Sequence, residues 1–165
     1  MCEKNFISEG DEKIIVHVSN FRPLKRIIDV IKIFEKVNLE ISSKLIMVGD
    51  GPDKKKAKDY LRKNNLKNSV IFLGKTNEVD EILCSSDLFL LPSEKESFGL
   101  SALEAMALKV PVVSTNTGGL KELNINGNSG YTSEIGDIDS MASNAIKILS
   151  DKSLTKKYRS QASEN

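Results

Sequence analysis

Two glutamates, Glu96 and Glu104, flank a seven-residue stretch that contains Phe98-Gly99-Leu100. A buried strand is predicted at 87–91, before Glu96, and a helix at 99–108, which contains Glu104, so the two glutamates span a strand-to-helix turn. The first N–H groups of a helix lack intrahelical partners and lie at the positive end of its dipole, which favours a phosphate there. The spacing therefore predicts a phosphate site between two carboxylates, one for a sugar and one for a ribose. As an isolated pattern it is more typical of a capping residue and a solvated helix carboxylate than of a binding site.

A basic loop follows the first predicted strand and contains Arg22 and Lys25. Ligands gather in such loops in open α/β sheets. A diphosphate needs compensating positive charge, and a guanidinium binds phosphate well. The alternative is a surface loop that is merely basic.

Two further features have simple structural interpretations. Gly49-Asp50-Gly51-Pro52 lacks the third glycine of a dinucleotide fingerprint, so a tight turn into a helix is its default interpretation. His17 is the only histidine, and we expect it to be packed or hydrogen-bonded rather than catalytic. The sequence contains no cluster of metal ligands, so neither a metal nor another cofactor is expected.

Taken together, these segments resemble the donor-site motifs of the retaining glycosyltransferases of the GT-B fold. Five segments carry the resemblance in the family's order, at 15–26, 47–52, 72–75, 93–100 and 116–119. It covers about residues 13 to 150. Within the family, 19–26 and 93–100 are most similar to the bacillithiol-pathway members, which transfer N-acetylglucosamine from a UDP donor to L-malate.

The resemblance implies a role for each charged residue. Glu104 would bind the ribose hydroxyls, and Glu96 would meet the donor sugar. Lys25 would contact the diphosphate. The arginine that usually accompanies this lysine maps onto Asn20, so Arg22 would act from a shifted position. Cationic side chains and helix N–H groups would hold the diphosphate without a metal, and the UDP-sugar would be a co-substrate.

Further residues border the donor site by the same resemblance. The backbone of Gly74-Lys75 would face the uracil edge, and Gly118-Gly119 would lie near the phosphates or only allow a turn with positive φ. The complete set of implied substrate-binding residues is Glu104, Ser97, Phe98, Gly99, Leu100, Asn20, Gly51, Gly74, Lys75, Gly118 and Gly119, with Glu96, Lys25 and Arg22 as the catalytic group.

Short β-branched runs alternate with amphipathic segments along the chain, which predicts an α/β fold. We expect one doubly wound, Rossmann-like domain with a mostly parallel six-stranded sheet and helices on both faces, the C-terminal half of a GT-B fold. The strands are predicted at 13–19, 44–48, 69–73, 87–91, 110–114 and 130–133. The helices are predicted at 26–38, 53–64, 77–84, 99–108, 119–123 and 138–149, with Asp137 or Asp139 as the cap of the last helix and a polar tail after Asp151.

Composition excludes several other classes. The 165 residues are 39% hydrophobic and 28% charged with a net charge of +1, which suits a soluble domain and gives no electrostatic case for nucleic acid. Lys54-Lys55-Lys56 is expected to be the solvated face of a helix. No apolar run approaches the ~20 residues of a membrane span. Cys2 and Cys84 are too few for a disulfide framework or a metal site, which favours a reducing cytoplasm.

The chain is too short for a second Rossmann domain, so the acceptor-binding N-terminal domain is expected to be absent from residues 1–165. The isolated chain should then bind UDP weakly and transfer nothing. Two alternatives stay open: a cell-envelope glycosyltransferase with the same donor half, and a non-catalytic nucleotide-sugar-binding or interaction module. A homo-oligomer is also left open.

Overall fold

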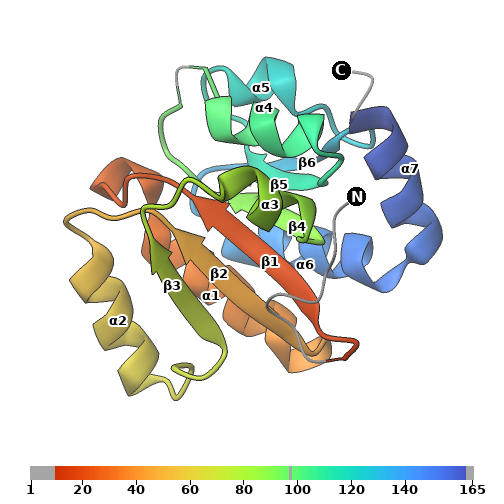
Figure 1. Ribbon diagram of the computed structural model, residues 1–165. Coiled ribbons are helices and arrows are strands. Elements are labelled where there is room, and N and C mark those ends of the chain that lie inside the picture. Colours follow the sequence, from red (N-terminus) through yellow and green to blue (C-terminus); the bar gives the residue numbers. More distant parts are fainter. Residues whose placement is uncertain (1–9, 97, 163–165) are drawn as a thin grey trace.

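The computed structural model describes residues 10–96 and 98–162 of the chain. Its centre is a six-stranded sheet in the order β3-β2-β1-β4-β5-β6, and every neighbouring pair is parallel (Figure 1). The predicted α/β fold with a six-stranded sheet is therefore confirmed, and the sheet is wholly parallel. The strands are β1 (Lys13–Val18), β2 (Ser43–Val48), β3 (Val70–Gly74), β4 (Leu88–Leu91), β5 (Val112–Thr115) and β6 (Gly130–Ser133).

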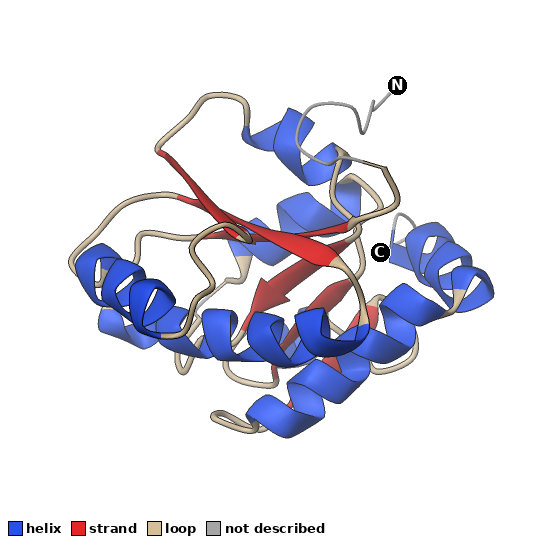
Figure 2. Cartoon of the chain, turned by 90° about the horizontal axis from the view of Figure 1, so that it is seen from below, coloured by secondary structure: helices blue, strands red, loops and turns tan. Residues whose placement is uncertain are grey.

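Helices cover both faces of this sheet (Figure 2). They are α1 (Ile27–Glu40), α2 (Lys54–Lys63), α3 (Val79–Cys84), α4 (Leu100–Ala107), α5 (Leu120–Leu123), α6 (Ile138–Ser150) and α7 (Lys152–Ala162), with a 3-10 helix, η2, at Pro23–Lys25. Successive strand residues point to opposite faces and enter two separate cores. Ile15 packs with α1 and α6 in one core, whereas Val16 packs with α3 and α4 in the other.

The predicted strands and helices agree with the observed ones to within two residues at each end. Asp137 caps α6, because its side chain accepts a hydrogen bond from the Ser140 N–H at 3.1 Å. The sequence prediction is wrong after Asp151, where α7 replaces the expected polar tail. Asp151 ends α6 in an extended conformation, and its side chain then accepts from the Leu154 N–H at 3.0 Å, which starts a new helix. Leu154 packs against the first core.

The strand order creates a crevice between β1 and β4. From β1 the chain builds β2 and β3 on one side, and it then returns to place β4, β5 and β6 on the other (Figure 1). The helices that follow β1 and β4, α1 and α4, pack into the cores on opposite faces of the sheet. The two strands pair only at Ile15↔Leu88 and Val16↔Phe89. Such a switch point, at the carboxyl ends of the strands, is where open α/β sheets bind ligands.

Within the described residues, no helix combines the length and apolar character needed to cross a membrane. Lys55 and Lys56 of α2 are exposed, as expected of a solvated helix face. Cys84, at the end of α3, is half-buried and disulfide-bonded. The sequence argument for a reducing compartment did not anticipate that bond.

Candidate functional site

A hollow of about 550 Å³ opens at the carboxyl ends of β1 and β4. Three segments form its wall: the loop after β1, the loop after β4 and the first turns of α4. Its lining residues are Val18, Ser19, Asn20, Leu24, Lys25, Lys95, Glu96, Phe98, Gly99, Leu100, Ser101 and Glu104.

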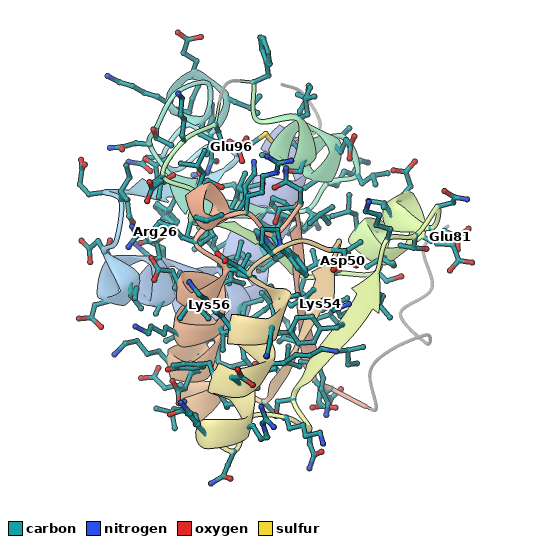
Figure 3. The ribbon with its side chains drawn as sticks, turned by 90° about the vertical axis from the view of Figure 1, so that its left-hand side faces the viewer. Arg26, Asp50, Lys54, Lys56, Glu81 and Glu96 are labelled. Carbon is teal, nitrogen blue, oxygen red and sulfur yellow. The ribbon has the colours of Figure 1, made fainter. Side chains whose placement is uncertain are left out.

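An ion pair joins the two sides of this hollow. The Lys25 ammonium on η2 contacts Oε1 of Glu96 in the loop after β4. The hydroxyl of Ser93, which is fully buried, donates to the same oxygen at 3.1 Å. Glu96 is only 9% exposed and the Lys25 side chain 21%, so the pair is partly shielded from water. Figure 3 shows Glu96 in the upper part of the view, above the yellow helix α2 that carries Lys54 and Lys56.

The turn that carries Lys25 is fixed at both ends. Phe21 before it and Arg26 after it have positive φ angles of 46° and 50°. The Arg26 guanidinium donates to Asp29 at 2.6 Å and to Glu94 at 3.2 Å, which ties the loop after β1 to the loop after β4. The hydrogen bond that Arg26 donates to Asp29 is the main cause that raises the pKa of Arg26, so this link stays charged.

The loop after β2 supports the turn that carries Lys25. A Cβ at Gly51 would lie 2.0 Å from the carbonyl oxygen of Asn20, so only glycine permits this close approach. The Asp53 N–H also donates to the Phe21 carbonyl at 3.0 Å. The glycine-rich turn after β2 therefore packs against the loop after β1 and supports it. Gly51 itself does not line the hollow.

The N-terminal end of α4 forms the opposite wall. Gly99 precedes it in the left-handed conformation, and the first intrahelical bond runs from the Leu103 N–H to the Gly99 carbonyl at 2.9 Å. The N–H groups of the first turn thus lie at the positive end of the helix dipole, beside the hollow. Phe98 is 77% exposed at the mouth, and Glu104 is exposed one turn further along the helix.

The loop after β5 holds the backbone of Glu96. The Gly119 N–H donates to the Glu96 carbonyl at 3.0 Å, and a Cβ at Gly118 would lie 1.9 Å from that oxygen. At the end of β3, the carbonyl of Gly74 accepts from the Gly49 N–H at 2.9 Å, and Lys75 is exposed beyond it.

The hollow brings together about half of the residues that the sequence indicated. Those in its lining are Asn20, Lys25, Glu96, Phe98, Gly99, Leu100 and Glu104. Those outside its lining are Arg22, Gly51, Gly74, Lys75, Gly118 and Gly119. Arg22 is exposed and precedes η2 in an extended conformation, while Ser97 lies outside the described residues. The ligand contacts implied for all of them stay predictions.

Sequence reasoning missed four polar residues of this site. Ser19, Lys95 and Ser101 line the hollow, and Ser93 supports Glu96 from beneath. Three of them lie inside the motif segments 15–26 and 93–100, and Ser101 follows Leu100, but the sequence does not show which loop side chains face a site.

His17 is buried and hydrogen-bonded as expected. Burial lowers its pKa to about 4, so the imidazole is neutral at pH 7. Its ring stacks between Phe21 and Phe89, with centroid distances of 6.3 and 6.4 Å. Among the described residues, no group of three or more His, Cys, Asp or Glu side chains is arranged to hold a metal ion.

A hollow lined by a basic loop, an acidic loop and a helix N-terminus, at the switch point of a doubly wound parallel sheet, is where open α/β proteins bind their ligands. Residues 3–165 match the family described as "Glycosyl transferases group 1", and the chain belongs to that family. It is 45% identical over 159 residues to N-acetyl-alpha-D-glucosaminyl L-malate synthase from Bacillus anthracis. That alignment covers 96% of this chain and 42% of the relative.

Solved structures agree with this family membership. The chain superposes on TarM from S. aureus, solved in complex with Fondaparinux, alpha-GlcNAc-glycerol and UDP, with a TM-score of 0.88 and 30% identity. It superposes on HepE from Anabaena, solved with UDP and glucose, with a TM-score of 0.86 and 25% identity. Each match covers 93% of this chain but only 31% and 43% of the solved chains. The resemblance to GT-B glycosyltransferases is confirmed, and the chain spans less than half the length of these relatives.

Proposed function

We propose that this chain is the donor-binding half of a retaining glycosyltransferase that transfers N-acetylglucosamine from UDP-N-acetylglucosamine to L-malate in bacillithiol biosynthesis. The observation that carries the proposal is that one hollow holds Lys25, Glu96 and the start of α4 together. The 45% identity to N-acetyl-alpha-D-glucosaminyl L-malate synthase supports the choice of this sugar and this acceptor.

Each group of the hollow has a role in holding the donor. Lys25 and the N–H groups of the first turn of α4 compensate the charge of the diphosphate. Glu104, one turn further along α4, accepts hydrogen bonds from the ribose hydroxyls. Glu96, at the start of the turn, accepts hydrogen bonds from the sugar hydroxyls.

The reaction is a substitution at the anomeric carbon with retention. The bond from this carbon to the β-phosphate oxygen breaks, and its electron pair leaves with UDP. The malate hydroxyl attacks from the same face, and its proton passes to the departing phosphate. The protein stabilises the charge that develops on the leaving group and positions the two partners. This scheme requires no metal ion.

Acceptor binding is assigned to a part of the enzyme outside this chain, because the chain spans only 42% of the malate synthase relative. We expect the isolated chain to bind UDP without transferring sugar. We place the enzyme in the cytoplasm, on the basis of the relative's small-molecule chemistry and not on the cysteines.

Calorimetry of the chain with UDP, UDP-N-acetylglucosamine and ADP tests the donor assignment. We expect both uracil ligands to bind and ADP to bind more weakly. A preference for ADP would remove the donor assignment. Transfer to malate by this chain alone would show that no other half is needed.

The acceptor is tested with the complete enzyme. We expect N-acetylglucosamine from the UDP donor to appear on L-malate and not on poly(ribitol-phosphate), the polymer named for a 31%-identical relative from S. aureus. The opposite result would favour the cell-envelope alternative. UDP binding without transfer to either acceptor would favour the non-catalytic module.

A further inference from the structure

His17 lies where the pairing between β1 and β4 stops. The two strands are last paired at Val16↔Phe89, one residue before the histidine. Beyond this point the ring of His17 replaces the backbone as the link, because its Nδ1 lies 2.8 Å from the carbonyl oxygen of Leu90 on β4. The other ring nitrogen, Nε2, lies 2.7 Å from Oγ of Ser19 in the loop after β1.

The direction of each hydrogen bond follows from the chemistry of its partners. A carbonyl oxygen only accepts, so Nδ1 carries the proton and donates to Leu90. The neutral ring then accepts at Nε2, and the Ser19 hydroxyl donates to it. With its proton directed to the ring, Oγ of Ser19 accepts the N–H of Phe21 at 3.3 Å. A single chain of hydrogen bonds thus connects β4 to the backbone of Phe21.

This chain of bonds ends at a strained position. Phe21 has a φ of 46°, which is uncommon for an aromatic residue and needs support from its surroundings. The backbone turns at Phe21 and enters η2, which carries Lys25 into the hollow. Ser19 itself lines the hollow.

We propose that His17 is a positioning residue, which through Ser19 and Phe21 fixes the loop that presents Lys25 to the diphosphate of the donor. The proposal rests on the function proposed above. An ordinary core residue would need only an apolar ring between Phe21 and Phe89. His17 instead uses both ring nitrogens, and each bonds a different side of the crevice.

The test measures binding of UDP and of uridine to single variants at a temperature where all are folded. His17→Phe retains an aromatic ring but loses both bonds, and Ser19→Ala removes the hydroxyl alone. We expect both variants to weaken UDP about tenfold and to leave uridine within about twofold, since only UDP reports on Lys25.

Two polar variants separate the bonds. In His17→Asn the amide nitrogen replaces Nδ1 and retains the bond to Leu90, whereas in His17→Gln the amide oxygen replaces Nε2 and retains the bond to Ser19. We expect His17→Gln to bind UDP more tightly than His17→Asn does. The reverse order would overturn the route through Ser19.

The matched control is Asn124→Leu. Asn124 is equally buried and bonds the carbonyl of Val112, the first residue of β5, at the amino end of the sheet, and it does not line the hollow. We expect this variant to lose stability and to keep its UDP affinity. If His17→Phe and Ser19→Ala also kept theirs, His17 would be a structural core residue only.

Amide hydrogen exchange tests the positioning role of His17 without any ligand. We expect peptides that span 19–26 to exchange faster in His17→Phe, with no change in peptides from β6. If the native chain failed to bind UDP, the donor assignment would fall. Unchanged exchange at 19–26 would overturn the positioning role whether or not UDP binds.

Discussion

Lys25 and Glu96 lie 71 residues apart in the sequence and form an ion pair across the crevice between β1 and β4. The lysine and the glutamate therefore neutralise each other in the absence of a ligand. A diphosphate that approaches Lys25 has to compete with the carboxylate for the ammonium group, and it is also repelled by that carboxylate.

Neutralising the carboxylate should therefore tighten UDP binding. We expect Glu96→Gln to raise UDP affinity about three- to tenfold while uridine affinity stays unchanged, because uridine carries no phosphate. Titration calorimetry of the native chain and of Glu96→Gln, each with UDP and with uridine, measures these affinities. Weaker UDP binding in Glu96→Gln would mean that the carboxylate mainly orients Lys25.

In the complete enzyme the same substitution should lower turnover. A carboxylate that holds sugar hydroxyls acts on positioning and on charge at the anomeric centre, neither of which UDP alone reports. The comparison is made at a temperature where both proteins are folded, since losing a charge near the start of α4 costs about 0.3–1 kcal/mol of stability. Unchanged turnover would reduce Glu96 to a structural carboxylate.

Removing the ammonium group should have the opposite effect on UDP. We expect Lys25→Ala to weaken UDP about ten- to a hundredfold, the effect of losing one charge-assisted phosphate contact, and to leave uridine nearly unchanged. In the double variant with Glu96→Gln, the part of the gain that comes from freeing Lys25 should vanish, and the part that comes from removing the carboxylate's repulsion should remain. A UDP affinity within about twofold of the native value in Lys25→Ala would end the phosphate role of this loop.

Glu104 should act on the nucleoside and not on the phosphates. We expect Glu104→Ala to weaken UDP and uridine by the same factor, because both ligands carry the ribose. Glu122→Ala is the matched control, since it removes an exposed carboxylate of α5 that does not line the hollow. A loss confined to UDP would place Glu104 at the diphosphate instead.

Asn20 and Arg22 offer a comparison within one loop. Asn20 lines the hollow, whereas Arg22 is exposed outside its lining. We expect Asn20→Ala to reduce UDP affinity more than Arg22→Ala does. A larger loss in Arg22→Ala would mean that the guanidinium turns into the site when the diphosphate binds, as the family resemblance implied.

Acid should destabilise the chain through His17. Its pKa is lowered from 6.5 to about 4 in the folded state, so the unfolded chain binds more protons between these values. The contribution of the neutral His17 ring to the free energy of unfolding is complete above pH 6.5 and is lost as the pH falls toward 4. We expect the free energy of unfolding to drop by about 2 kcal/mol between pH 7 and pH 5. Urea titrations of His17→Gln, which has no histidine, should show little of this drop.

The sequence predicted the regular elements well because each has a periodic apolar pattern. Val30, Phe34 and Val37 recur at helical spacing in the amphipathic segment that became α1, and short β-branched runs mark the strands. The helix α7 was missed because its sequence is polar overall and its start depends on the side chain of Asp151.

The site was predicted only in part, because its geometry depends on contacts between distant loops. The sequence indicated Lys25 and Glu96 separately, but nothing in it showed that they form a pair. The turn at Phe21 is set by the loop after β2, through Asp53 and the close approach at Gly51, and these contacts have no local signal. Arg22 was for this reason assigned without knowing which way it faces.

The close approach at Gly118 has a consequence for how mutational data on this protein are interpreted. Any side chain at this position would collide with the carbonyl oxygen of Glu96 and push that residue out of place. In a saturation-mutagenesis screen, Gly118 should therefore tolerate substitution as poorly as Glu96 itself. Such a screen would therefore make Gly118 look like a ligand-binding residue, although its role is to leave room for the backbone of Glu96.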